Sequence, residues 1–189
     1  NRSVRLAVLS PRECAADIWR HLNKLNKHHA TTLKQDKVFL PEYIGFQDIF
    51  RCGLNIPNGN DTKRFKGYSL NDDLKASAEE FFNGICRYID VMEREKHEFD
   101  VLVIYIPNQL SKMRELKNEN VYFDLHDSLK IYCAGKGIVT QIIEERSVHT
   151  NSDMAKIMWG LSTAIYIKAI GKLWKPKITR YDTAYIGLS

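Results

Sequence analysis

Short apolar runs alternate along this chain with longer segments in which apolar residues recur every three or four positions. Each short run predicts a buried strand, and the spacing in the longer segments predicts amphipathic helices. Because strands and helices alternate, the predicted fold class is α/β, a Rossmann-like parallel sheet flanked by helices. The predicted strands span residues 4–9, 49–56, 101–106, 138–140 and 185–188, and the predicted helices span residues 11–27, 72–96, 123–134 and 152–170.

Local patterns refine this outline. Ser10 followed by Pro11, with Glu13 three residues after the serine, is typical of a capping box at the start of the first helix. Residues 58–73 are rich in Asn, Asp, Gly and Lys and predict an exposed loop. Apolar residues at helical spacing predict that the first helix turns one stripe toward the core, made of Ile18, Trp19, Leu22 and Leu25.

The length of the chain, 189 residues, fits one domain or one domain with a fragment of the next. It begins with Asn1-Arg2-Ser3-Val4 and lacks a signal-peptide pattern, so we expect a piece excised from a longer protein. No stretch approaches the roughly 20 apolar residues of a membrane helix. The four cysteines form no CxxC or zinc pattern, which predicts buried free thiols in a cytoplasmic protein.

The net charge of +5 is modest, but its distribution is uneven. Between His126 and Arg180 there are nine Lys and Arg residues against four Asp and Glu residues. This excess favours a polyanionic partner for the last third of the chain. A solvated basic helix face would give the same composition, so charge alone leaves both interpretations open.

Four residues in this basic region suit a terminal phosphate. The four-residue spacing of His126 and Lys130 places both on one helical face. Gln141 is expected just past the carboxyl end of a strand, and Lys168 at the end of the long helix. Two ammonium groups would neutralise a phosphate and the amide would donate to it, while the imidazole ring can stack on the terminal base.

The order of these residues resembles the MID domain of Argonaute and Piwi proteins, in which an aromatic residue, Lys, Gln and Lys hold the 5′ phosphate of a guide. His126 stands at the place of the usual tyrosine, whereas Lys130, Gln141 and Lys168 match directly. The sequence departs from the family at Ile170, where glycine is common. The resemblance extends to Tyr43-Ile44-Gly45-Phe46 and to Trp174.

The resemblance also implies a division of the chain. Residues 1–180 would form the MID domain, and residues 181–189 would begin a PIWI domain, which has an RNase H-like nuclease fold. In active members an aspartate follows a Gly-apolar pair on the first PIWI strand, but here Ser189 follows Gly187-Leu188. The chain therefore resembles the catalytically inactive prokaryotic Argonautes, often of the short type, and we expect a binding module and no enzyme.

The partners implied by the resemblance are a guide RNA or DNA with a 5′ phosphate, a complementary target strand, the PIWI domain of the same protein and an associated effector protein. Together they would act in defence against foreign DNA, without a membrane partner. Candidate supporting contacts are Thr140, Lys172 and Asn108. We expect no cofactor and no metal in this chain alone. In the intact protein, Mg²⁺ at the guide 5′ end would have Gln141 as its nearest protein ligand.

Other functions were weighed on the same residues. A dinucleotide-binding domain would need G-x-G-x-x-G after the first strand, and residues 9–13 contain no glycine. A regulatory domain that binds a small phosphorylated ligand or nucleotide remains the alternative, because the same groups suit any terminal phosphate. The acids near the pattern form no catalytic cluster by spacing: Asp124, Asp127, Glu144 and Glu145. The remaining histidines considered lack metal-ligand spacing: His28, His29 and His97.

Overall fold

The computed structural model of the chain describes residues 3–31, 41–69, 77–113, 115–118, 121–149 and 153–171. Several sequence predictions lie outside these residues. They are the supporting contact Lys172, the match at Trp174, the strand at 185–188 and the PIWI segment at 181–189 with Ser189.

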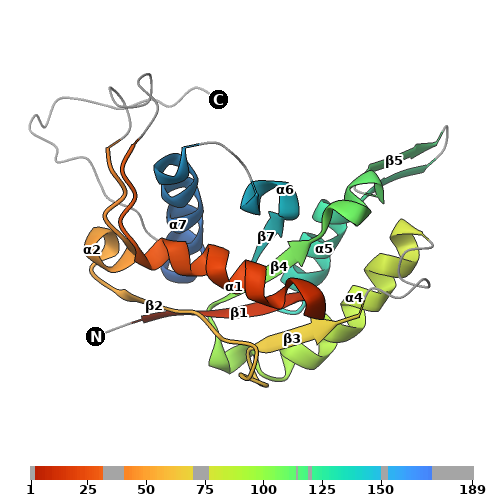
Figure 1. The fold of residues 1–189 in the computed structure, drawn as a ribbon. Helices are drawn as coiled ribbons and strands as arrows, with labels where there is room; N and C mark the ends of the chain where they lie inside the picture. The colour runs from red at the N-terminus through yellow and green to blue at the C-terminus, as the bar shows by residue number, and fades with distance from the viewer. Residues whose placement is uncertain are drawn as a thin grey trace, which may run out of the picture.

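A five-stranded sheet forms the centre of the molecule, and all of its strand pairs are parallel (Figure 1). The order of the strands is β2-β1-β4-β7, and β3 pairs with β1 on the same side as β2. This architecture confirms the predicted α/β class with a Rossmann-like parallel sheet. The strands are β1 (Ser3–Pro11), β2 (Gly53–Asn55), β3 (Phe65–Tyr68), β4 (Val101–Ile106) and β7 (Thr140–Glu144).

Helices cover both faces of this sheet (Figure 1). One layer holds α1 (Ala15–Asn23), α2 (Phe46–Phe50), α6 (Glu145–Val148) and α7 (Met154–Ile170). The other layer holds α4 (Ala78–Glu93) and α5 (Leu125–Gly135). The described residues also form the 3₁₀ turns η1 (Arg12–Cys14), η2 (Lys24–Asn26), η4 (Lys96–Glu98) and η5 (Asn108–Met113), and an antiparallel hairpin of β5 (Glu115–Asn118) and β6 (Val121–Asp124).

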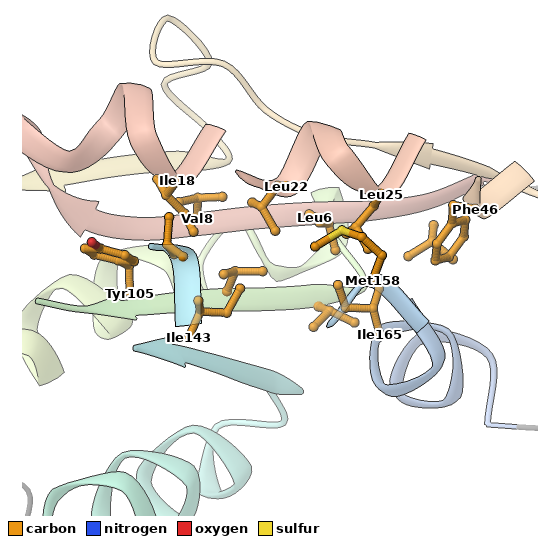
Figure 2. Packing of buried hydrophobic residues seen from close by; sticks show 14 of the residues in the cluster. Leu6, Val8, Ile18, Leu22, Leu25, Phe46, Tyr105, Ile143, Met158 and Ile165 are labelled. Carbon is orange, nitrogen blue, oxygen red and sulfur yellow. The ribbon is translucent and has the colours of Figure 1, made fainter. Parts of the chain in front are cut away.

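The alternation of side chains along β1 divides the core into two clusters. Leu6 and Val8 point to the layer that contains α1 and α7, whereas Ala7 and Leu9 point to the layer of α4 and α5. Figure 2 shows the first cluster, in which Met158 and Ile165 of α7 share one core with Ile18 and Leu22 of α1. Because both faces are covered, β1 and β4 are buried along almost their whole length, as their continuous apolar runs predict.

The predicted capping box is wrong. Pro11 has an extended backbone, with φ −55° and ψ 144°, and it is the last residue of β1, paired with Tyr68. The Ser10 hydroxyl is buried and donates to the carbonyl oxygen of Pro11 instead of capping a helix. Helix α1 starts only at Ala15, after the η1 turn. Pairing with β3 therefore extends the strand through the residues that resemble a helix start.

Two predicted segments also differ from the structure. The strand predicted at 49–56 is a short helix, α2, followed by the three-residue β2, with Arg51 in the left-handed region (φ 55°) between them. The exposed loop predicted at 58–73 contains strand β3. Tyr68 is the reason, because its ring is fully buried and its hydroxyl donates to the carbonyl oxygen of Tyr105 at 3.3 Å.

Trp19 was predicted to face the core but is 42% exposed. Ile18, Leu22 and Leu25 form the buried stripe of this segment, and Trp19 lies one position around the helix from it. The four cysteines form no disulfide with one another; Cys86 and Cys133 are buried, whereas the other two are only partly buried. Among the described residues, no helix has the length and apolar character needed to cross a membrane.

Candidate functional site

Strand β7 is the last strand of the described sheet, and Gln141 is its second residue, opposite Val103 of β4. The prediction that Gln141 follows the carboxyl end of a strand is therefore wrong: this residue lies near the amino end. Gly137, with φ +69°, ends the turn after α5, and pairing with β4 begins where Leu102 N–H donates to the carbonyl oxygen of Val139. The strand then continues through two isoleucines to Glu144.

The alternation along β7 decides which side chains can form a site. Gln141 shares a face with Ile143, which packs in the cluster that contains α7. Thr140 lies on the other face and is only 8% exposed. The predicted supporting contact Thr140 is thus a buried residue that points away from the face on which Gln141 lies.

Lys168 reaches Gln141 from the last turn of α7. Its ammonium donates to the Gln141 side-chain oxygen at 2.7 Å. Gly171, in the left-handed region at φ +79°, ends the helix three residues later, so Lys168 lies where helix carbonyl groups favour a cation. The Gln141 amide nitrogen donates to the carbonyl oxygen of Ile142 at 2.9 Å, which holds the amide in place.

Lys130 approaches the same place from the opposite layer. Burial lowers the pKa of Lys168, and the positive charge of Lys130 lowers that pKa further. Lys130 belongs to α5, which packs on the other face of the sheet from α7. The charge of Lys130 thus acts on Lys168 from the other face of the sheet. Of the four residues predicted from the sequence, the structure brings Lys168 and Gln141 into contact and places Lys130 near enough for its charge to act on Lys168.

His126 lies one helical turn before Lys130 on α5, and its side chain is 29% exposed. Its Nδ1 atom is 3.2 Å from a carboxylate oxygen of Asp127, which orients the ring. Asp124 caps the helix by accepting a hydrogen bond from the Asp127 N–H at 2.9 Å. The ring is thus held at the start of α5, on the helix that carries Lys130. Its described partner is this carboxylate, with no described contact to Gln141.

These three residues at the start of α5 also bring potential metal ligands together. One ligand atom each from Asp124, His126 and Asp127 lie within 4.8 Å of one another. This group was not predicted from the sequence, although the pattern Asp-x-His-Asp at the start of a helix indicates it. A second such group contains His97 with two glutamates, one of which also pairs with Lys63 at 2.6 Å. Exposed groups of this kind are common without an ion, so we assign no metal to either.

Asn108 lies at the other end of the sheet from Gln141. It follows the carboxyl end of β4, and its backbone N–H donates to a carboxylate oxygen of Glu145 at 2.7 Å. The switch point between β1 and β4, where α/β sheets often bind ligands, thus carries an acidic group. Glu144 pairs with Arg146 nearby. The structure gives Asn108 no role beside the two lysines.

The arrangement at the β7 edge can bind an anion. Within the part of the chain that the structure describes, neither Lys130 nor Lys168 has a carboxylate within ion-pair distance. Two neighbouring ammonium groups repel each other, and partial burial weakens the screening by water. An anion bound between the two ammonium groups would reduce both their repulsion and the free-energy cost of partly burying their charge. A terminal phosphate, with two negative charges and three acceptor oxygens, fits this demand.

The chain matches no known protein-family profile and no curated protein. Its fold is similar to a crystal structure of Aa-Ago with externally bound siRNA, with a TM-score of 0.56 and 11% identity, over 89% of this chain and 19% of that chain. A structure of Aquifex aeolicus Argonaute gives a TM-score of 0.49 and 14% identity over the same shares. The chain thus spans about a fifth of the length of these Argonautes. At such identity the first likeness establishes the fold alone: this chain has the fold of a domain-sized part of Aa-Ago.

Proposed function

We propose that this chain is the MID domain of a prokaryotic Argonaute-like protein and that it binds the 5′ phosphate of a guide nucleic acid. One observation carries the proposal: Lys168 donates to Gln141 at β7, the outer strand of the described sheet, and neither it nor Lys130, whose charge acts on it, has a described carboxylate partner. The similarity in fold to part of an Argonaute supports the same interpretation.

Each of the four residues has a distinct task in this proposal. Lys168 and Lys130 neutralise the phosphate and donate charge-assisted hydrogen bonds to its oxygens. The Gln141 side-chain oxygen accepts one hydrogen bond from the Lys168 ammonium and so fixes it, which keeps the remaining two donors of that group available. His126 provides a flat ring at the start of α5 on which the terminal base can stack, and Asp127 sets the orientation of that ring.

The same geometry bears on the Mg²⁺ ion that the family resemblance implies for the intact protein. The Gln141 side-chain oxygen already accepts a hydrogen bond from an ammonium group. An oxygen in this position is a poor ligand for a divalent cation, and the lysines beside it repel one. The described residues around Gln141 therefore do not fit a magnesium site, and we assign no step to a metal there.

Recognition without cleavage is the second part of the proposal. We propose that the parent protein anchors the guide, orients it for pairing with a target strand and passes the paired state to a partner. Ser189 supports this, because a hydroxyl group cannot replace a carboxylate that holds catalytic metal ions. Guide-directed cleavage by the full-length parent with magnesium or manganese, lost when a PIWI acidic residue is mutated, would contradict this part alone.

A titration with three ligands tests the guide-binding function. The ligands are a single-stranded oligonucleotide with a 5′ phosphate, the same strand with a 5′ hydroxyl, and the matching nucleoside 5′-monophosphate. We expect the phosphorylated strand to bind about tenfold or more tightly than the hydroxyl strand, because only the former engages both lysines. We also expect it to bind more tightly than the mononucleotide, with an affinity that falls as salt is added.

The alternative function gives the opposite pattern. A regulatory domain for a small phosphorylated ligand would bind the mononucleotide as tightly as the strand, with little dependence on salt. Equal affinity for the 5′-phosphorylated and 5′-hydroxyl strands would contradict any terminal-phosphate site at the β7 edge.

A further inference from the structure

A second group of positively charged side chains lies at the opposite edge of the sheet. A hollow of about 420 Å³ opens beside β3, three strands away from β7. Its volume falls within the range of roughly 300–1,000 Å³ that is usual for small-molecule sites. None of the residues that line it belongs to the site at β7. The residues that line the hollow include Arg12, Gly59, Thr62, Phe65, Lys66 and Gly67.

Arg12 is fixed against β3 at the rim of this hollow. Its Nε atom donates to the carbonyl oxygen of Gly67 at 3.2 Å. A Cβ atom added at Gly67 would lie 2.7 Å from Cγ of Arg12, so the absence of a side chain there lets the arginine lie across the strand. An arginine has five N–H donors, and this bond uses one of them. The two terminal guanidinium nitrogens remain, and together they can donate to two oxygens of one phosphate group.

Lys66 provides the second cation, and its ammonium donates to the carbonyl oxygen of Thr62. Residues next to Thr62 in the sequence form ion pairs of their own: Asp61 with Arg64 at 2.7 Å, and Lys63 with Glu98 at 2.6 Å. Within the described ranges, no carboxylate forms an ion pair with Arg12 or Lys66.

We propose that this hollow is a second phosphate site, in which Arg12 and Lys66 bind the phosphate group of a nucleotide. Both cations are held by backbone carbonyl groups, so they keep their positions without an acid that would compete with the ligand. The volume exceeds the needs of a phosphate alone, and Phe65 supplies an aromatic ring in the lining for the organic part of the ligand. The nucleotide is either free or part of a nucleic-acid strand. This proposal does not depend on the site at β7.

An NMR titration of the ¹⁵N-labelled chain tests it, with the amide resonances of Gly59 and Gly67 as reporters inside the lining. The ligands are inorganic phosphate, adenosine 5′-monophosphate and a single strand with a 5′ hydroxyl. We expect adenosine 5′-monophosphate to shift both glycine resonances in a saturable way. Arg12→Ala and Lys66→Ala should each weaken this binding roughly tenfold, as the loss of a charge-assisted contact does. Tighter binding of the strand than of the mononucleotide would identify the strand as the source of the phosphate.

Two controls make the result specific. Lys63→Ala removes the same charge from the same segment but outside the hollow, and it should change the affinity by less than about twofold. Lys168→Ala should leave the glycine shifts unchanged, which separates this site from the one at β7. Saturating ligand without shifts at Gly59 and Gly67, or equal weakening by Lys63→Ala, would overturn the proposal. The NMR spectrum also shows whether the Arg12→Ala variant is folded. If that variant is unfolded, the affinity of Lys66→Ala decides whether the proposal holds.

Discussion

Two lysines near the ends of helices, Lys136 and Lys168, have opposite surroundings. Lys136 follows α5, and its ammonium lies 2.8 Å from Asp90, 3.0 Å from Glu93 and over the ring of Tyr132. The hydrogen bonds to the two carboxylates raise its pKa. Lys168 lies in the last turn of α7 beside Gln141, where burial and the charge of Lys130 lower its pKa. The charge of Lys136 is thus neutralised by acids of the same protein, whereas the charge of Lys168 is repelled by another lysine.

This difference separates a structural cation from a binding cation. Lys136 connects α5 to α4, which carries both of its acidic partners. Its charge is therefore used within the fold and offers little to a ligand. Among the described residues, neither Lys168 nor Lys130 forms an ion pair with an acid of a neighbouring element. Their charge therefore favours the binding of an anion from outside the chain.

The largest expected effect is on binding. Lys168→Ala should cost about 1.5–3 kcal/mol of affinity for a 5′-phosphorylated strand, because a charge-assisted contact is lost. Lys130→Ala should have a similar effect. The matched control is Lys136→Ala, which removes the same charge and should leave the affinity unchanged. Fluorescence anisotropy measures all three variants. A loss of similar size in Lys136→Ala would show that general positive charge, not the β7 edge, attracts the strand.

The second prediction concerns alkaline pH. Because the folded-state pKa of Lys168 is lowered, its ammonium loses a proton below the ordinary lysine value of 10.5. Affinity for the phosphorylated strand should therefore fall as pH rises through a range below 10.5, and Lys168→Arg should move this fall to higher pH. An affinity that stays constant up to the ordinary lysine range in the unmodified chain would contradict the lowered pKa.

Stability should respond in opposite directions at the two lysines. The charged form of Lys168 is disfavoured in the fold, so its unfavourable contribution to stability is removed as pH rises from its lowered pKa to 10.5. The raised pKa of Lys136 gives stability that is present below 10.5 and lost as pH rises through the folded value. Denaturant unfolding between neutral and alkaline pH, compared for Lys168→Met and Lys136→Met, checks both signs.

Salt dependence should show a smaller difference. Each phosphate contact on a single strand contributes about 0.7 to the slope of the logarithm of the binding constant against the logarithm of salt concentration. Lys130→Ala should lower this slope by roughly that amount. An unchanged slope would mean that Lys130 does not contact the strand. Lys136→Ala should keep the slope of the unmodified chain.

The smallest expected effect is on thermal stability at neutral pH. Lys136→Met leaves Asp90 and Glu93 without their shared cation and should lower the melting temperature slightly, since ion pairs that water still reaches contribute little. Lys168→Met should leave the melting temperature unchanged or raise it, because it removes a repulsion. Differential scanning calorimetry distinguishes the two, and a larger loss in Lys168→Met would reverse the comparison.

The strands that could be predicted are those whose whole length is buried. The apolar runs of β1 and β4 indicate central parallel strands because helices cover both of their faces. Strand β3 escaped prediction because Tyr68 is its only fully buried residue within a polar segment. A partner strand, not local sequence, also decides that Pro11 continues β1. Tertiary pairing thus overrides the local capping pattern.

The site could be predicted as a set of residues but not as a geometry. The order of His126, Lys130, Gln141 and Lys168 indicates phosphate chemistry, and the structure brings the last two into contact, with the charge of Lys130 acting on Lys168. This arrangement follows from the alternation in β7 and from the packing of α5 and α7 on opposite faces, which spacing alone does not specify. The carboxylate of Asp127 beside the imidazole was also not predicted, although the two residues are adjacent in the sequence.

A double-mutant cycle tests the central claim most directly. The two changes are Lys168→Ala in the protein and replacement of the 5′ phosphate by a hydroxyl in the strand, and the affinity is measured for all four combinations. If Lys168 contacts the terminal phosphate, the two changes are not additive, and the coupling is about 1.5–3 kcal/mol. Lys136→Ala in the same cycle gives no coupling. Additive effects of Lys168→Ala and phosphate removal would contradict a 5′-phosphate site at the edge of β7.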